Sequence, residues 1–153
     1  MTSDSFSLIE PDSILFSLES TTREEAFVEM VQHLIDQKLI PHELHQQVLD
    51  ALEAREQKLS TSVGRELAIP HAAIHDLPAV VKLFARCPNG IESSARDGLP
   101  VRYFYMSLIP DDDYSAHLKT IASISSFFRE DANLDKLKKA SSLSELFAVF
   151  TNS

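Results

Sequence analysis

The chain has 153 residues, of which 44% are apolar, and it carries a formal net charge of −9. This length and apolar content predict a single domain over residues 1–153, and the acidity excludes general binding to nucleic acid, because a phosphate backbone rewards clustered Lys and Arg. The opening MTSDSFSLIE has neither the basic nor the long apolar segment of a signal peptide, and no later stretch approaches the ~20 apolar residues of a membrane span. We therefore expect a cytoplasmic protein without membrane insertion.

Two helices are predicted over residues 20–56. Thr22 and Glu25 have the spacing of a capping box. Apolar residues then recur at the three- and four-residue intervals of one buried helical face: Phe27, Met30, Val31, Leu34 and Ile35. Pro41 suits the first turn of the second helix, which should bury Leu44, Val48, Leu49 and Leu52 and place Arg55 near its end.

Two strands are predicted in the middle of the chain, where the apolar period changes. Residues 79–87, AVVKLFARC, are rich in β-branched and apolar residues and precede the turn-forming sequence PNG. Residues 101–109, VRYFYMSLI, follow a DGLP turn and end at a proline.

Helical periodicity returns after Pro110. Asp111, Asp112 and Asp113 can cap a helix and complement its positive end. The predicted buried face of this helix contains Leu118, Ile121, Ile124, Ser125 and Phe128. Two short helices finish the chain, the last starting at Ser142 with Glu145 at capping-box spacing and burying Leu146, Phe147 and Phe150. Helices, then strands, then helices predict an α/β domain whose central sheet is covered by helices.

His71 is the strongest candidate for a functional residue. Pro70 fixes its own φ and pushes Ile69 toward extended geometry, so LAIPH is interpreted as a short strand with the histidine at its end. Ligands of α/β sheets gather at strand ends. A histidine that only caps a loop is the alternative that these residues leave open.

Phosphoryl transfer is one chemistry that suits such a histidine. A neutral imidazole attacks phosphorus through one nitrogen while the other donates a hydrogen bond. The phosphorylated product carries nearly two negative charges and needs cationic or hydroxyl donors. Arg55, Ser60, Thr61 and Arg65 are near in sequence, and the fold could bring His117 to the same place.

Metal binding is the competing chemistry. On a helix, His71 and His75 would share one face and Asp76 could add a carboxylate. The segment lacks the glutamate that zinc proteases place between two such histidines, and the helix would have to begin directly after Pro70. The single cysteine, Cys87, cannot build a cysteine zinc site. We therefore expect no metal and no cofactor.

The segment AREQKLSTSVGRELAIPHA, residues 54–72, resembles the phosphorylation segment of enzyme IIA domains of the fructose, mannitol and nitrogen-regulatory class in the bacterial phosphoenolpyruvate-dependent phosphotransferase system. The pattern Arg-Glu, Ser-Thr, Ala-Ile-Pro-His is present as Arg55-Glu56, Ser60-Thr61 and residues 68–71. DGLPV at 97–101 and PDDDYSAHLKTIASIS at 110–125 resemble later parts of the same family.

The resemblance implies a mixed sheet of about five strands with helices on both faces. It implies that His71 is phosphorylated by the histidine phosphocarrier protein HPr or its nitrogen-branch counterpart. His117 would line the site, Arg55 would be the cation near the phosphoryl group, and Ser60, Thr61, Gly64 and Arg65 would belong to the phosphate-site loop. A IIB component or a regulatory target protein would be the next partner, and no cofactor or metal is implied.

One departure from the family pattern lies in the turn before His71. Several glycines are usual there, whereas this chain has Gly64 followed by Arg65 and Glu66. Arg65 could donate to the phosphate or pair with Glu66. Two functions are therefore compared: a phosphoryl carrier, and a regulatory protein-binding module that keeps the fold but is not phosphorylated. Because the chain contains no fused IIB, IIC or HPr region, the stand-alone nitrogen-regulatory type is favoured over a sugar-transport component.

Overall fold

The central sheet of the protein has six strands, in the order β1-β5-β6-β3-β2 with β4 paired to β6. The computed structural model describes residues 9–93 and 95–151, so most of the opening stretch used to judge a signal peptide lies outside the described residues. The strands are β1 (Ile14–Leu15), β2 (Ser62–Gly64), β3 (Leu67–Ala68), β4 (His71–Ile74), β5 (Val81–Ile91) and β6 (Val101–Pro110). The α-helices are α1 (Arg23–Asp36), α2 (His45–Lys58), α3 (Tyr114–Arg129), α4 (Asp131–Lys139) and α5 (Leu143–Thr151), with short 3-10 helices at Pro11–Ser13 and His42–Leu44.

β3 and β4 are two parts of one interrupted strand. Both run parallel to β6, and the pairs Leu67–Tyr103 and His71–Ser107 have the same offset of 36 residues (103 − 67 and 107 − 71). The other pairs are parallel for β1–β5 and antiparallel for β5–β6 and β2–β3. The predicted mixed sheet of about five strands is confirmed, since the six strands occupy five positions.

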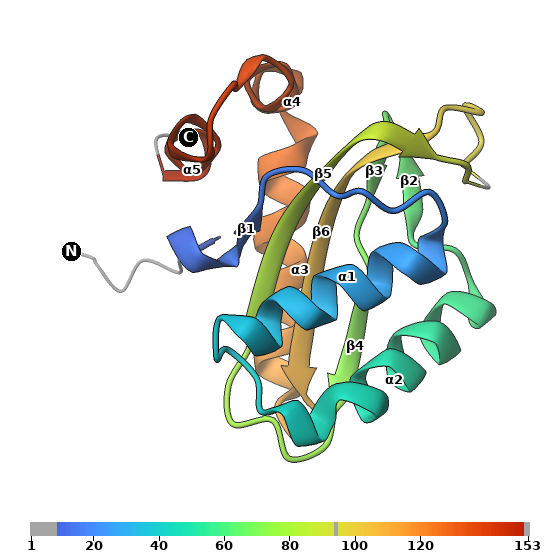
Figure 1. Cartoon of the computed structure of the whole chain (residues 1–153), viewed down its shortest axis with the longest axis vertical. Coiled ribbons are helices and arrows are strands. Elements are labelled where there is room, and N and C mark those ends of the chain that lie inside the picture. Colours follow the sequence, from blue (N-terminus) through green and yellow to red (C-terminus); the bar gives the residue numbers. More distant parts are fainter. Residues whose placement is uncertain (1–8, 94, 152–153) are drawn as a thin grey trace.

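Helices cover both faces of the sheet, as predicted: α1 and α2 lie on one face and α3, α4 and α5 on the other (Figure 1). Side chains of a strand point alternately to its two faces. Along β6, Phe104 and Met106 therefore join the core under α1 and α2, while Tyr103 and Tyr105 join the core under the last three helices.

Three of the predicted helix starts are confirmed by their caps, whereas the second helix starts later than predicted, since Pro41 precedes a 3-10 helix and α2 begins at His45. Thr22 Oγ1 accepts a hydrogen bond from Glu25 N at 3.1 Å, and Asp113 Oδ1 accepts one from Ala116 N at 3.0 Å. Ser142 Oγ accepts from Glu145 N at 3.1 Å. These side chains supply acceptors for N–H groups that the first helical turn leaves unpaired.

The predicted buried face of α3 is partly wrong. Leu118 is 53% exposed and Ser125 is also exposed, whereas Thr120, Ile124, Phe127 and Phe128 are buried. Each residue turns a helix by about 100°, so Leu118 lies about 200° from Thr120 and faces away from the sheet. This places an apolar side chain on the surface one residue after His117.

The turn predicted after residue 87 is also wrong. β5 continues through Pro88, Asn89 and Gly90 to Ile91, which pairs with Val101. The register shifts between Arg86 and Ile91, and Gly90 takes a positive φ of 75°. The residues interpreted as a turn form an irregular part of a long strand because β6 continues to pair beyond them.

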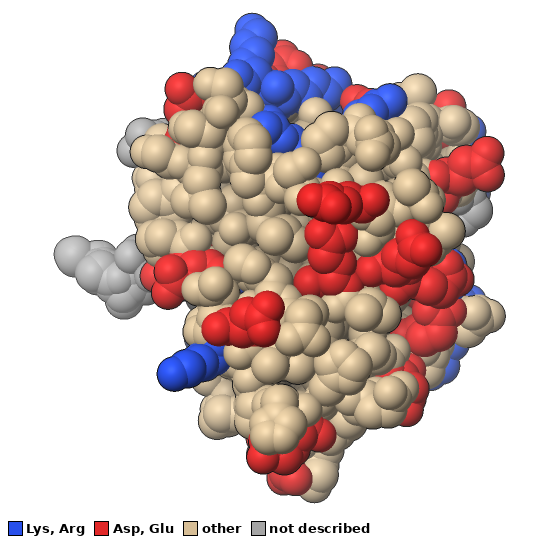
Figure 2. All heavy atoms as spheres, in the orientation of Figure 1, with Lys and Arg blue, Asp and Glu red and all other residues tan. Residues whose placement is uncertain are grey.

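Charge is unevenly distributed on the face seen in Figure 2, where acidic side chains gather over α1 and basic side chains gather near α4. α1 contains Glu24, Glu25, Glu29 and Asp36, whereas α4 contains Lys136, Lys138 and Lys139. Within the described ranges, no helix is long and apolar enough to cross a bilayer.

Candidate functional site

His71 lies at the start of a strand, not at the end of one as the sequence predicted. Pro70 has no N–H, so the β3 ladder stops at Ala68 and pairing with β6 resumes at His71. The Pro70 carbonyl accepts a hydrogen bond from Ser107 N at 3.0 Å. The interruption fixes the backbone on both sides of the break and leaves the His71 side chain half-buried at the sheet surface.

Both ring nitrogens of His71 have hydrogen-bond partners. Nδ1 lies 3.0 Å from the Ile69 carbonyl oxygen, which can only accept, so we assign the proton to Nδ1. Nε2 then carries the lone pair and accepts from Arg55 Nε at 3.3 Å. The imidazole is thus held as one tautomer with its nucleophilic nitrogen next to a guanidinium.

Arg55 is positioned by the end of α2 and the loop that follows. Its Nη1 donates to the Leu59 carbonyl at 2.6 Å. The neighbouring Glu56 holds the same loop, because its carboxylate accepts from Thr61 N at 3.0 Å and from Thr61 Oγ1 at 2.7 Å. The two residues of the Arg-Glu pair therefore have different roles. Arg55 contacts His71, and Glu56 fixes the loop that orients Arg55.

His117 reaches the site from the first turn of α3. Its ring centroid is 5.8 Å from that of His71 and 6.1 Å from that of Tyr114. Arg55, His71 and His117 line one pocket of about 550 Å³, so the structure brings these three predicted residues together.

Lys58 and Tyr114 line the same pocket and were missed by the sequence analysis. The sequence spacing indicated both residues. Lys58 follows Arg55 by three residues on α2, and Tyr114 precedes His117 by three residues on α3. Residues three apart share a helix face, so each accompanies a predicted site residue.

The surroundings of His71 lower its pKa below the ordinary value. Burial is the largest cause, and the positive charges of Arg55 and His117 act in the same direction. The hydrogen bond to the Ile69 carbonyl and the negative charge of Glu56 oppose the shift in part. The imidazole is consequently neutral near pH 7, which is the form that acts as a nucleophile.

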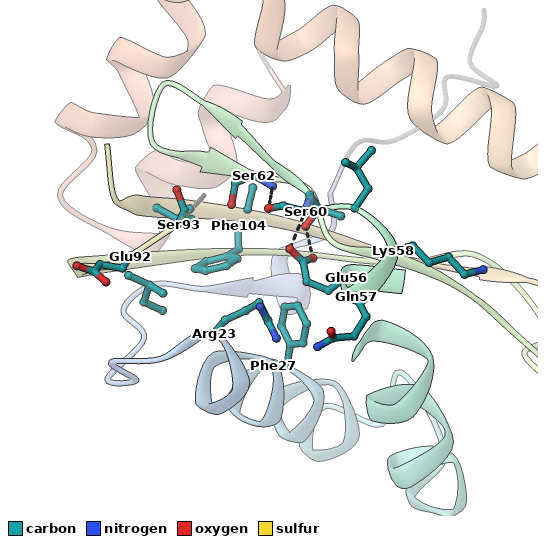
Figure 3. A pocket seen from close by; sticks show the side chains of 15 residues that line it. Arg23, Phe27, Glu56, Gln57, Lys58, Ser60, Ser62, Glu92, Ser93 and Phe104 are labelled. Atoms are coloured by element: carbon teal, nitrogen blue, oxygen red, sulfur yellow. Dashed lines mark hydrogen bonds between the residues drawn. The ribbon is translucent and has the colours of Figure 1, made fainter. Parts of the chain in front are cut away.

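Ser60 and Thr61 face a different pocket, of about 540 Å³, shown in Figure 3. Thr61 is 5% exposed and bound to Glu56, while Ser60 Oγ accepts from Ser62 N at 3.1 Å. Neither lines the His71 pocket, although Lys58 lines both. Ser60 and Thr61 are thus connected to His71 through the loop that orients Arg55.

Gly64, the last residue of β2, and Arg65, in the turn between β2 and β3, line neither pocket. Arg65 Nη1 donates to the Phe128 carbonyl at 2.7 Å, and Nη2 contacts Asp131 Oδ1 at 2.6 Å. Arg65 therefore does not pair with Glu66, which instead binds Arg102 at 2.8 Å and Lys138 at 3.2 Å.

The histidine pair weighed as a metal site does not lie on a helix, because residues 71–74 form β4 and His75 follows in a turn. The His75 side chain is 73% exposed and lies 3.2 Å from Asp111 and 3.4 Å from Asp76. In the part of the chain that the structure describes, no group of three or more His, Cys, Asp or Glu side chains is arranged to hold a metal ion.

Comparison with known proteins adds a family match. A family model described as phosphoenolpyruvate-dependent sugar phosphotransferase system, EIIA 2, matches residues 7–153. A nitrogen regulatory protein from Bradyrhizobium diazoefficiens is 28% identical over 142 residues, which cover 93% of this chain and 91% of the relative. A fructose-specific EIIA component from Haloferax volcanii is 36% identical over 95 residues, 61% of each chain. The crystal structure of nitrogen regulatory protein IIA-Ntr from Neisseria meningitidis has a TM-score of 0.82 and 25% identity, covering 92% of this chain and 94% of that one.

Proposed function

Because the chain belongs to the EIIA 2 family of the phosphoenolpyruvate-dependent sugar phosphotransferase system, we propose that it is a phosphoryl carrier whose acceptor atom is Nε2 of His71. The resemblance predicted from residues 54–72 is confirmed by this membership. Members of this family act as phosphotransferase components or, among the nitrogen regulatory relatives, in regulation.

The observation that carries the proposal is the arrangement around Nε2. A neutral ring is held by the Ile69 carbonyl, and its lone pair points to the Arg55 guanidinium in an open pocket. A nucleophile and a cation for the incoming charge are thus prepared together.

The transfer requires only groups of this chain and a phosphorylated donor. The donor's P–N bond breaks and its electron pair stays on the donor nitrogen, while the Nε2 lone pair forms the new P–N bond. The Nδ1 proton stays in place, and the Ile69 carbonyl stabilises the positive charge that the ring acquires. Arg55 moves its hydrogen bond from Nε2 to the phosphoryl oxygens, whose negative charge it stabilises during in-line transfer.

Lys58 adds a second cation to the lining of the pocket, and His117 adds a hydrogen-bond donor. His117 faces the His71 ring, and its imidazole can donate to a phosphoryl oxygen. Asp111 and Asp113 also line the pocket, but Asp111 is within 3.2 Å of His75 and Asp113 accepts from Ala116 N. These contacts reduce the repulsion between the rim carboxylates and a phosphoryl group.

The donor that we propose is a histidine phosphocarrier protein, HPr or its nitrogen-branch counterpart. We further propose that the phosphorylation state is used mainly as a regulatory signal, because the nitrogen regulatory protein from Bradyrhizobium diazoefficiens matches over 93% of this chain and 91% of its own length, and the structure of IIA-Ntr from Neisseria meningitidis covers 92% and 94%. Transfer to a IIB component is the second possible output.

Intact mass spectrometry tests the proposal directly. The purified chain is incubated with phosphoenolpyruvate, enzyme I and the phosphocarrier protein. We expect one acid-labile phosphoryl adduct, absent in His71→Ala and retained in His75→Ala, whose histidine lies outside the pocket.

The alternative function makes the opposite prediction. If the wild-type chain gains no adduct under conditions that phosphorylate an EIIA control domain, the carrier proposal is wrong and the chain acts as an unphosphorylated binding module.

A further inference from the structure

A second pocket lies beside the His71 site, on the other side of the loop that follows α2. It has a volume of about 540 Å³, within the size range of small-molecule sites. Its walls come from the start of α1, the end of α2 with its loop, and the ends of β5 and β6 (Figure 3). The function proposed above does not use this pocket.

Glu56 places a buried negative charge in the wall of this pocket. The residue is 8% exposed. Two hydrogen bonds from Thr61 reach its carboxylate, which can accept about four. Across the described ranges, no Lys, Arg or His side chain forms an ion pair with Glu56, and Figure 3 shows Lys58 extending away from it. Buried charges are usually paired, so this carboxylate favours a cationic donor in the pocket.

Arg23 gives the pocket a positive group that is only partly satisfied. Its Nη2 contacts Glu24 at 3.0 Å and Glu53 at 2.5 Å, and its guanidinium carbon lies 5.9 Å from the centre of the Phe27 ring. Its Nε is buried and has no hydrogen-bond partner, which is true of only one other side-chain atom among the described residues, Thr120 Oγ1. The buried Nε is out of reach of a ligand, but both ion pairs use Nη2, so the donors of Nη1 are the ones that can meet an anionic acceptor in the pocket.

The remaining walls are largely apolar. Phe27, Ile91, Val101 and Phe104 line the pocket, and Figure 3 shows Phe27 and Phe104 facing it together with Glu56 and Arg23. Ser60, Ser62 and Ser93 add hydroxyl groups at the rim. A ligand that binds the Glu56 carboxylate, the Arg23 guanidinium and the apolar walls needs an ammonium group, a carboxylate and a compact apolar body.

We propose that this pocket binds a small apolar α-amino acid, with its ammonium group on Glu56, its carboxylate on Arg23 and its side chain against Phe27 and Phe104. Glu56 has unused acceptor positions and Arg23 has donors beyond its Nη2 ion pairs, so a zwitterion is a small ligand that uses both groups.

Occupancy of the pocket would be transmitted to the His71 site. The ligand contacts Glu56 and the loop through Thr61, and the Leu59 carbonyl of that loop binds Arg55. Binding therefore changes how firmly Arg55 is held beside Nε2 and alters the rate of phosphorylation. This consequence rests on the proposed function, whereas the binding itself does not.

Titration of the ¹⁵N-labelled full chain with L-leucine and with L-phenylalanine, followed by NMR, tests the binding. We expect saturable shifts of the amides of residues 57–62 and 91–93. Each charge of the ligand is tested with an analogue that lacks it: 3-methylbutylamine has no carboxylate, and 4-methylpentanoate has no ammonium group. Each analogue should bind about tenfold more weakly or worse than L-leucine, the loss expected for a charged hydrogen bond.

Two variants separate the binding site from its surroundings. Arg23→Gln and Glu56→Gln should each weaken L-leucine binding about tenfold or more. Asp36→Asn, at the far end of α1 and outside the pocket, should leave it unchanged. If Glu56→Gln perturbs the loop, Arg23→Gln and the two analogues still test whether the pocket binds the charged groups of L-leucine.

Absence of saturable shifts with both amino acids would overturn the proposal, and so would equal binding of L-leucine and its analogues. Because NMR detects binding without phosphorylation, this failure is distinguishable from failure of the carrier function. The rate of His71 phosphorylation, measured with and without L-leucine, then tests whether occupancy of the second pocket affects the His71 site.

Discussion

The His71 pocket and the turn between β2 and β3 each contain an arginine from the same sequence motif, but the two arginines do different work. Arg55 donates to Nε2 of His71 in a pocket open to a partner. Arg65 is occupied by the Phe128 carbonyl and Asp131, and it does not line that pocket. A cation contributes to the proposed chemistry only where its donors face the acceptor atom, so proximity in sequence is a poor guide.

The contacts of this turn also explain how it forms without the glycines that are usual in the family. In the turn, Arg65 and Glu66 have φ values of 57° and 68°, the left-handed region that glycine adopts most easily. That conformation costs about 1–2 kcal/mol per non-glycine residue. Contacts of Arg65 with Asp131 and of Glu66 with Arg102 and Lys138 hold the turn against this cost. The departure from the family pattern is therefore accommodated away from His71.

The largest expected effect concerns Arg55. Arg55→Gln should lower the rate of His71 phosphorylation about 100-fold, because the transferring group loses its cation. The matched variant Arg65→Gln should leave the rate unchanged. Rates are measured by mass spectrometry with the phosphocarrier protein as donor. Equal losses of phosphorylation rate in Arg55→Gln and Arg65→Gln would contradict the different roles assigned to the two arginines.

A smaller effect is expected from the loop that orients Arg55. Thr61→Val removes one hydrogen bond from the buried Glu56 carboxylate and should lower the free energy of unfolding by about 1–3 kcal/mol. It should also slow phosphorylation, because the Leu59 carbonyl moves with the loop. Urea denaturation gives the free energy, and an unchanged midpoint would contradict the role assigned to Glu56.

The pKa of His71 predicts a modest dependence of stability on pH. In the unfolded chain His71 takes up its proton near pH 6.5, whereas in the folded protein it does so at lower pH. The unfolded state therefore binds more protons in this window, so the stabilisation is present above pH 6.5 and is lost as the pH falls through the folded pKa.

NMR titration of the His71 ring checks the direction of this shift. In Arg55→Gln the pKa should rise, since a positive neighbour is removed. In His71→Gln this component of the pH dependence of stability should be absent. A folded pKa at or above 6.5 would contradict the assignment of burial as the dominant cause.

The smallest effect is expected in the turn. Arg65→Gly relieves one left-handed residue but loses an exposed ion pair and a hydrogen bond, so the free energy of unfolding should change by less than about 1 kcal/mol. Phosphorylation should proceed at the wild-type rate. A large loss of either stability or rate would show that the turn supports the His71 pocket.

Much of the fold and part of the candidate site could be predicted from local patterns. The caps at Thr22, Asp113 and Ser142 depend only on residues within one helical turn. His71 was singled out by its place after Pro70, with Arg55 and His117 among the candidate donors, and the resemblance supplied the role of each; the structure brings the three into one pocket. Lys58 and Tyr114 were missed although they share helix faces with Arg55 and His117, because spacing places a residue on a face but does not show whether its side chain reaches the pocket.

The sequence by itself determined the helices and the β-rich middle, because these follow from side-chain period and capping groups. Only the tertiary structure decided that β3 and β4 share one register along β6, that Leu118 faces solvent, and that Arg65 turns to α3 and α4 while Arg55 turns to His71. These outcomes depend on contacts between residues far apart in the chain, and local pattern carries no information about which of several available partners a side chain meets.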